Sequence, residues 1–216
     1  MSSVFNALKQ ETQANHARLE CTYPFLSYQC VENLTSGAYA DILSVMALFH
    51  QAAHDVLVDA SASRAISQVL AQHANGKDIL TALDCDQRAL ATVSRPVSKP
   101  QPPNVVLPTF HSSVTSSIAA LYVWLGSSMG ANIILRRLIN SDKALPTHYY
   151  SAMANASKQW ISFKFTVESE FANLIADEVF TQHLVDDANS WFEYLICLGT
   201  AHLAKPELTS SSEHVI

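Results

Sequence analysis

The sequence contains little glycine and few charged residues. Only 5 of its 216 residues are glycine and 15% are charged, whereas 49% are hydrophobic. Disordered chains show the opposite balance, because they lack the apolar side chains that offset the entropy cost of ordering the chain. The composition therefore predicts a folded protein with a substantial core, and its length fits one ordinary domain.

The sequence also has few basic residues and no closely spaced pairs of cysteines. The chain has 13 Lys and Arg residues against 19 Asp and Glu, so we expect no nucleic-acid binding, which needs a basic surface. The cysteines show no CxxC spacing and are expected to be small buried residues of a reducing compartment: Cys21, Cys30, Cys85 and Cys197. The first residues, MSSVFNALKQE, lack the apolar segment of a signal peptide, which predicts a cytoplasmic protein.

Apolar residues recur at helical spacing, and no segment is typical of a strand or an internal repeat. This pattern predicts an all-α protein. The expected helices cover residues 4–20, 36–58, 64–74, 77–90, 113–140, 149–175 and 179–203. Five of the 8 prolines fall within 94–108, which is therefore expected to be a loop. We expect one helical domain over 1–205 and a loose polar tail over 206–216.

One long stretch carries no charge. No charged residue occurs between Lys99 and Arg136, and residues 118–135 are strongly apolar. A stretch of this length could span a bilayer. Because it also contains several serines and Asn132, and the rest of the chain is ordinary globular sequence, we favour a buried helix and expect no membrane span.

His16 is the first candidate for a functional residue. Leu8, Thr12 and His16 follow one another at steps of four, which predicts that the imidazole faces inward. Glu20 lies four residues further on, and a carboxylate beside the ring can fix the tautomer that leaves the other nitrogen free for a metal. The plainer interpretations are a hydrogen-bonded core histidine and a salt bridge on the helix surface.

A strip of small residues is the second candidate. Gly126 and Gly130 each cost a helix about 1 kcal/mol relative to alanine, and Ser127 and Ala131 extend the same surface. Such a strip allows a flat molecule or another backbone to approach closely, and it permits a kink. Close packing of two helices would explain the strip equally well.

Together these segments resemble bacterial heme oxygenases. The stretch LKQETQANHARLE matches the N-terminal helix of that family, L-(R/K)-x-x-T-x-x-x-H-x-x-L-E. The stretch YVWLGSSMGA matches its distal helix, Y-V-x-x-G-S-x-x-G-A, and DILTALDCD is similar to its D-L-x-x-L-G segment. The resemblance extends over residues 4–204, and the two main motifs occur in the family's order.

The resemblance implies an all-α, single-domain heme oxygenase-like helical bundle with a kinked distal helix. Heme (iron protoporphyrin IX) would be both substrate and cofactor. His16 would be the axial metal ligand and Glu20 its hydrogen-bonding partner. The opposite heme face would be covered by Gly126, Ser127, Gly130 and Ala131. Catalysis would depend on the first three of these, because bare backbone beside the ring directs oxygen to one meso carbon.

The implied reaction is the oxidative ring-opening of heme to biliverdin, CO and Fe2+, using O2 and external electrons. The electron donor would be a ferredoxin, a flavodoxin or a reductase. A short ungapped match places Lys164 where the family has a propionate-binding arginine, and a solvated lysine is the alternative. Arg136 and Arg137 could dock the donor, or could simply interact favourably with the C-terminus of their helix.

The sequence departs from the family at three positions. Ser127 stands where vertebrate members have an aspartate that organises water, Leu125 where many bacterial members have glutamate, and Ala131 where others have a third glycine. These changes concern the proton path and the position of cleavage more than heme binding.

Other functions remain open at this point. One is a non-catalytic heme-binding protein or sensor on the same fold, and another is a helical scaffold with a different ligand. His50 and His54 have metal-ligand spacing, which permits a helical di-metal oxidase, although no ExxH motif accompanies them.

Overall fold

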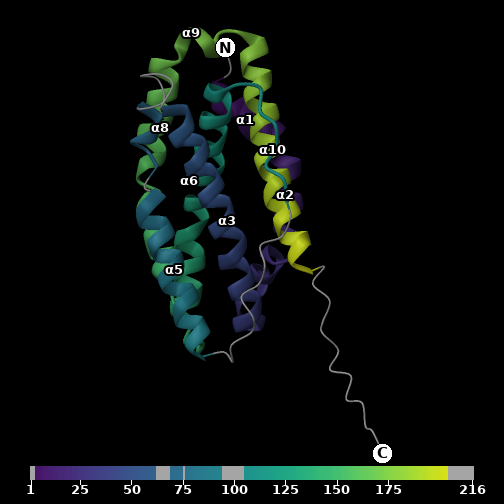
Figure 1. The fold of residues 1–216 in the computed structure, drawn as a ribbon, viewed down its shortest axis with the longest axis vertical. Helices are drawn as coiled ribbons and strands as arrows, with labels where there is room; N and C mark the ends of the chain where they lie inside the picture. The colour runs from purple at the N-terminus through teal and green to yellow at the C-terminus, as the bar shows by residue number, and fades with distance from the viewer. Residues whose placement is uncertain (1–2, 62–68, 75, 94–104, 204–216) are drawn as a thin grey trace, which may run out of the picture.

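The computed structural model describes residues 3–61, 69–74, 76–93 and 105–203. Within these ranges all regular secondary structure is helical, which confirms the predicted all-α class (Figure 1). The elements are α1 (Val4–Glu11), α2 (Gln13–Glu20), the 3-10 helix η1 (Phe25–Asn33), α3 (Ser36–Ser61), α5 (Gly76–Val93), α6 (Ser113–Ile139), α7 (His148–Ala156), α8 (Gln159–Glu170), α9 (Ala172–Ile175) and α10 (Glu178–Leu203).

The helices form an elongated bundle in which α6 packs against α3, α7 and α10 (Figure 1). Large side chains from these helices meet in the core, including Phe49, Trp124, Tyr149 and Trp191, each at most 2% exposed. Ser112 caps α6 through a capping box with Thr115, which satisfies free N–H groups at the start of the helix. The helix then continues without interruption through both of its glycines.

The strongly apolar part of the charge-free stretch, residues 118–135, lies within α6. By length and hydropathy it is the one helix of the described residues that could cross a membrane, and half of its most apolar window is buried inside the bundle. A core helix of a soluble protein has the same composition, and its contacts with α3, α7 and α10 agree with that interpretation.

Two predicted helices are divided in the structure. The helix expected over 4–20 is α1 and α2, separated at Thr12, whose hydroxyl donates to the Leu8 carbonyl at 2.7 Å. Such a bond competes with the helical pattern and bends helices. The helix expected over 149–175 is α7, α8 and α9, with interruptions at 157–158 and at the buried Phe171. The 3-10 helix η1 was not predicted.

The expectation of buried cysteines is wrong for three of the four. Cys21, Cys85 and Cys197 are free and exposed, because the inward faces of α5 and α10 are filled by larger side chains. The side chain of Cys30, residues 94–104 of the expected loop, residues 64–68 of the expected helix 64–74, and the tail 206–216 lie outside the described residues.

Candidate functional site

The junction of α1 and α2 contacts α6 through two hydroxyl groups. The hydroxyl oxygens of Thr12 and Tyr122 lie 3.3 Å apart, and Thr12 is only 2% exposed. Further along both segments, Arg137 near the end of α6 donates to the Tyr28 carbonyl of η1 at 3.4 Å. The segment from Thr12 to Tyr28 therefore runs along α6 in the same direction as that helix. The candidate site lies between the two contacts, on α2 and on the middle of α6.

His16 lies one helical turn beyond Thr12 on α2. Its side chain is 57% exposed, and its Nδ1 lies 3.6 Å from Oε1 of Glu20, which is 65% exposed. The ring contacts Phe192 of α10 edge-on, with 5.7 Å between ring centroids. The prediction that His16 faces inward is therefore wrong: the buried stripe of Leu8 and Thr12 ends before it, because α2 packs mainly against α10.

Polar contacts fix α2 on α10. Asn15 donates to Oδ1 of Asn189 at 2.9 Å. Arg18 forms a two-pronged pair with Glu193, with Nη1 to Oε1 at 2.6 Å and Nη2 to Oε2 at 2.5 Å. The hydrogen bond to Glu193 raises the pKa of Arg18. These charged and polar contacts hold α2, and with it His16, against α10.

The glycines of α6 face open space. A Cβ atom added to Gly126 or Gly130 would meet no other atom within 4 Å. Met129 is 53% exposed and Ile133 54% exposed, and both lie on the same helix face. Close helix packing, the ordinary explanation of such glycines, is therefore not what the described residues show.

The remaining small residues of α6 point in other directions. Ser127 is exposed, and its hydroxyl donates to the Trp124 carbonyl at 2.6 Å. Ala131 is 1% exposed and Leu125 is also 1% exposed, so both side chains belong to the core. The predicted strip is thus divided between an open face with the two glycines and a buried face with Ala131.

Lys164 lies at the other end of the region. Its Nζ is 5.3 Å from the centre of the Phe5 ring, and it lines a surface cavity of about 330 Å³ together with Trp160, Ile161, Phe165 and Glu168. Trp160 in turn contacts Tyr122, with 5.9 Å between ring centroids. The structure thus places Lys164 beside α1 and brings it together with neither His16 nor the glycines. A larger cavity of about 480 Å³ lies elsewhere, between α5 and α7.

The two histidines with metal-ligand spacing do not form a metal site. His50 is fully buried, and its Nε2 lies 3.1 Å from the Tyr149 hydroxyl. Burial lowers the pKa of His50 to about 3, so its ring is neutral at physiological pH. His54 packs against Gly76 instead. In the part of the chain that the structure describes, no group of three or more His, Cys, Asp or Glu residues could hold a metal ion, which removes support for a di-metal oxidase.

Sequence reasoning missed two buried aspartates that each bind a histidine at the start of a helix. Asp86 of α5 accepts from Nδ1 of His148 at 2.7 Å and from its backbone N–H at 3.0 Å. Asp187 of α10 makes the same pair of bonds to His111, at 2.8 and 3.1 Å. Each pair joins segments far apart in the chain, so no local spacing could have indicated it.

Comparisons with known proteins support the fold. The sequence matches no model of a known protein family, and it matches no curated protein sequence. Among solved structures, the heme oxygenase from Leptospira interrogans is similar, with a TM-score of 0.64 over 92% of this chain and 99% of that chain. The chain is therefore an all-α protein with the heme oxygenase fold. Sequence identity to that structure is 15%, so the likeness concerns the fold alone.

Proposed function

We propose that this protein is a heme oxygenase that opens the heme ring to biliverdin, CO and Fe2+, using O2 and electrons from a donor protein. The observation that carries the proposal is the open face of α6. Gly126 and Gly130 have no neighbour within 4 Å of an added Cβ, and His16 and Gly126 each lie one turn beyond the contact between Thr12 and Tyr122. On the heme oxygenase fold, this arrangement offers an imidazole on one helix and bare backbone on another.

His16 has the properties of an axial ligand. Its Nε2 has no hydrogen-bond partner among residues 3–61, 69–74, 76–93 and 105–203, and Nδ1 lies 3.6 Å from Glu20. A carboxylate beside Nδ1 favours the tautomer with its proton on that nitrogen, which leaves the lone pair of Nε2 for iron. Phe192 contacts the ring and limits its rotation. The exposed position of His16 therefore agrees with a residue that binds a ligand.

The open face of α6 suits a flat apolar molecule. Met129 and Ile133 supply exposed apolar surface beside the two glycines, and burying such surface favours binding. Bound heme would supply the redox and oxygen chemistry, and the protein would orient it. The Ser127 hydroxyl donates a hydrogen bond to the Trp124 carbonyl, so its oxygen is free to accept a hydrogen bond from a water molecule and to hold that water near the glycines.

The remaining assignments belong to the same proposal. Lys164 is a candidate for binding a heme propionate from the α8 side, and Ala131 contributes a small side chain beneath the open face. Arg136 and Arg137 are exposed at the end of α6, where a positive surface could dock an acidic ferredoxin or flavodoxin. Reaction with such donors fits a cytoplasmic protein.

Titration with hemin followed by addition of a reductant and O2 tests the proposal. We expect a Soret band typical of histidine ligation, then its loss as the biliverdin spectrum grows. His16→Ala should weaken hemin binding at least tenfold or change the spectrum. The matched control is His183→Ala, because His183 is also partly exposed and also contacts another ring, that of His111.

Three outcomes separate the alternatives. Turnover in the parent and its loss in His16→Ala support a heme oxygenase. A Soret band without bile pigment would indicate a non-catalytic heme-binding protein. If His16→Ala binds and turns over hemin like the parent, His16 is not the ligand.

A further inference from the structure

The centre of the bundle holds a connected group of buried hydrogen-bonding rings. His50 of α3, Trp124 of α6 and Tyr149 of α7 are at most 2% exposed. The rings of His50 and Trp124 have centroids 4.4 Å apart, and Nε2 of His50 lies 3.1 Å from the Tyr149 hydroxyl. None of these three side chains has a place in the proposed heme site.

The group continues towards the surface through two more tyrosines. The ring of Tyr149 lies 4.8 Å from that of Tyr150, and the ring of Tyr150 lies 5.7 Å from that of Tyr28. The hydroxyl groups of Tyr28 and Tyr150 are hydrogen-bonded. Tyr28 belongs to η1 and is half-buried, next to the exposed Arg137. A series of ring contacts therefore leads from Trp124 of α6, through the imidazole of His50, to the tyrosines and on to the half-buried Tyr28.

The direction of the bond between Tyr149 and His50 follows from counting partners. Nδ1 of His50 is buried without a hydrogen-bond partner in the described structure. If Nε2 donated to Tyr149, both the phenol proton and the lone pair of Nδ1 would lack partners. If the phenol donates to Nε2, only the N–H at Nδ1 lacks one, which costs less. The Tyr149 phenol is thus aimed at a neutral base.

We propose that Trp124, His50, Tyr149, Tyr150 and Tyr28 form a redox relay that carries oxidising equivalents away from the distal helix, with Tyr149 as its proton-coupled centre. The proposal rests on the proposed function for its source of oxidant, a one-electron oxidant formed from peroxide beside α6. Trp124 stands two residues before Gly126, and its carbonyl accepts the Ser127 hydroxyl.

Electrons and protons balance at each step. The oxidant is reduced by one electron from Trp124, which becomes an indole radical cation. Tyr149 then returns an electron to Trp124 and passes its phenol proton to Nε2 of His50, giving a phenoxyl radical and an imidazolium. Finally, Tyr28 supplies an electron through Tyr150, His50 returns the proton to Tyr149, and Tyr28 releases its own phenol proton to water. The net change is the loss of one electron and one proton from Tyr28.

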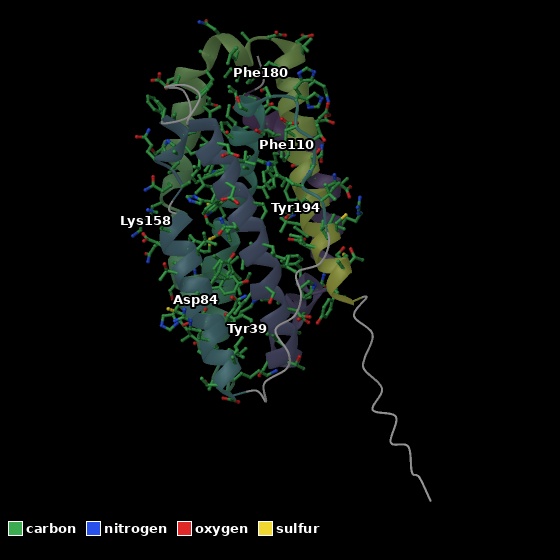
Figure 2. All side chains as sticks on the ribbon, viewed as in Figure 1. Tyr39, Asp84, Phe110, Lys158, Phe180 and Tyr194 are labelled. Carbon is green, nitrogen blue, oxygen red and sulfur yellow. The ribbon has the colours of Figure 1, made fainter. Side chains whose placement is uncertain are left out.

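Flash photoionisation of tryptophan in the heme-free protein tests the relay without the proposed function. We expect the indole radical to decay as tyrosyl radical absorption grows, and Tyr149→Phe to lower the tyrosyl yield at least twofold. The matched control is Tyr194→Phe. Tyr194 is also buried and contacts Trp191, with ring centroids 6.0 Å apart, and Figure 2 places it on α10. An equal effect of both variants would overturn the relay.

Peroxide treatment of the hemin-loaded protein tests the surface end of the relay. Peptide mapping should find oxidised Tyr28 in the parent and at least fivefold less in Tyr149→Phe, while electron paramagnetic resonance follows the tyrosyl radical. Tyr28→Phe, at a half-buried position, should leave the radical longer on the two buried tyrosines. Equal Tyr28 oxidation in the parent and Tyr149→Phe would overturn the relay. Failure of hemin to bind would reject the proposed function and leave the photoionisation result standing.

Discussion

The Thr12 hydroxyl donates to the Leu8 carbonyl at 2.7 Å and lies 3.3 Å from the hydroxyl of Tyr122. Because a hydroxyl has one proton, Tyr122 must be the donor in the second bond. One side chain therefore ends α1, begins α2 and fixes both against α6. His16 lies one turn beyond Thr12 on α2, and Gly126 lies one turn beyond Tyr122 on α6.

Thr12→Val should show what this contact contributes. Valine keeps the shape but leaves the Tyr122 hydroxyl without its partner, so the free energy of unfolding should fall by about 1 kcal/mol. Because His16 and Gly126 each lie one turn beyond this contact, its loss should also raise the Kd for hemin by up to about fivefold. Denaturant unfolding and hemin titration measure the two effects. Thr81→Val is the control, since Thr81 makes the same bond to its own helix at an exposed position. Equal effects of the two variants would remove the role given to Thr12.

Substitutions at Gly126 should change stability and heme binding in opposite directions. An added Cβ meets no atom within 4 Å, and alanine favours a helix by about 1 kcal/mol over glycine. Gly126→Ala should therefore raise the melting temperature of the heme-free protein, whereas Gly126→Leu should weaken hemin binding at least tenfold by occupying the open face.

Gly199→Ala provides the contrast. The added Cβ would lie 3.3 Å from Cδ of Pro24 and closer still to the Tyr23 carbonyl oxygen. Neither atom belongs to a flexible side chain that could move aside. This variant should lower the melting temperature, since the surrounding backbone must shift. If Gly126→Ala destabilised the heme-free protein as much, the α6 face would not be open.

The long helices could be predicted from the sequence because their apolar pattern persists over many turns. α3, α6 and α10 begin and end within a few residues of the expected limits. The interruptions at Thr12 and Phe171 could not, because each depends on a side-chain bond or on burial against another helix. A threonine in a helix is a weak signal by itself.

The sequence predicted the candidate site only in part, because the neighbours of a helix face come from distant parts of the chain. Helical spacing places His16 and the glycines on definite faces, yet it does not tell which neighbouring helix covers a face. The stripe through Leu8 and Thr12 therefore indicated an inward His16, although its side chain is 57% exposed. The buried Asp86 had no signal at all, because its partner His148 comes from another helix.

Acid should destabilise the protein through His50. A histidine in the unfolded chain takes up a proton near pH 6.5, whereas burial keeps His50 neutral down to about pH 3. Between these values the unfolded chain binds more protons, so the free energy of unfolding should fall by about 1.4 kcal/mol per pH unit below pH 6.5 from this residue alone. Urea unfolding of the parent and of His50→Gln over a pH series isolates the contribution. Identical slopes for the two proteins would show that His50 does not remain neutral.

Asp86 should be among the most sensitive positions in the fold. It is fully buried, and its carboxylate accepts bonds from Nδ1 and N–H of His148 and from the N–H of Tyr149 at 2.9 Å. Asp86 thus caps α7 from another helix, and its negative charge interacts favourably with the positive end of the α7 dipole. Asp86→Ala leaves these donors without an acceptor, so the free energy of unfolding should fall by about 2–4 kcal/mol.

A neighbouring aspartate supplies the control for this measurement. Asp84 is exposed and pairs with Arg88 at 2.7 Å, and exposed pairs of this kind contribute at most about 1 kcal/mol. Asp84→Ala should therefore change the denaturation midpoint little, while Asp86→Ala lowers it strongly. Asp86→Asn, which keeps one carbonyl oxygen as an acceptor, should fall between them. If Asp86→Ala were as stable as Asp84→Ala, the start of α7 would not depend on the buried carboxylate.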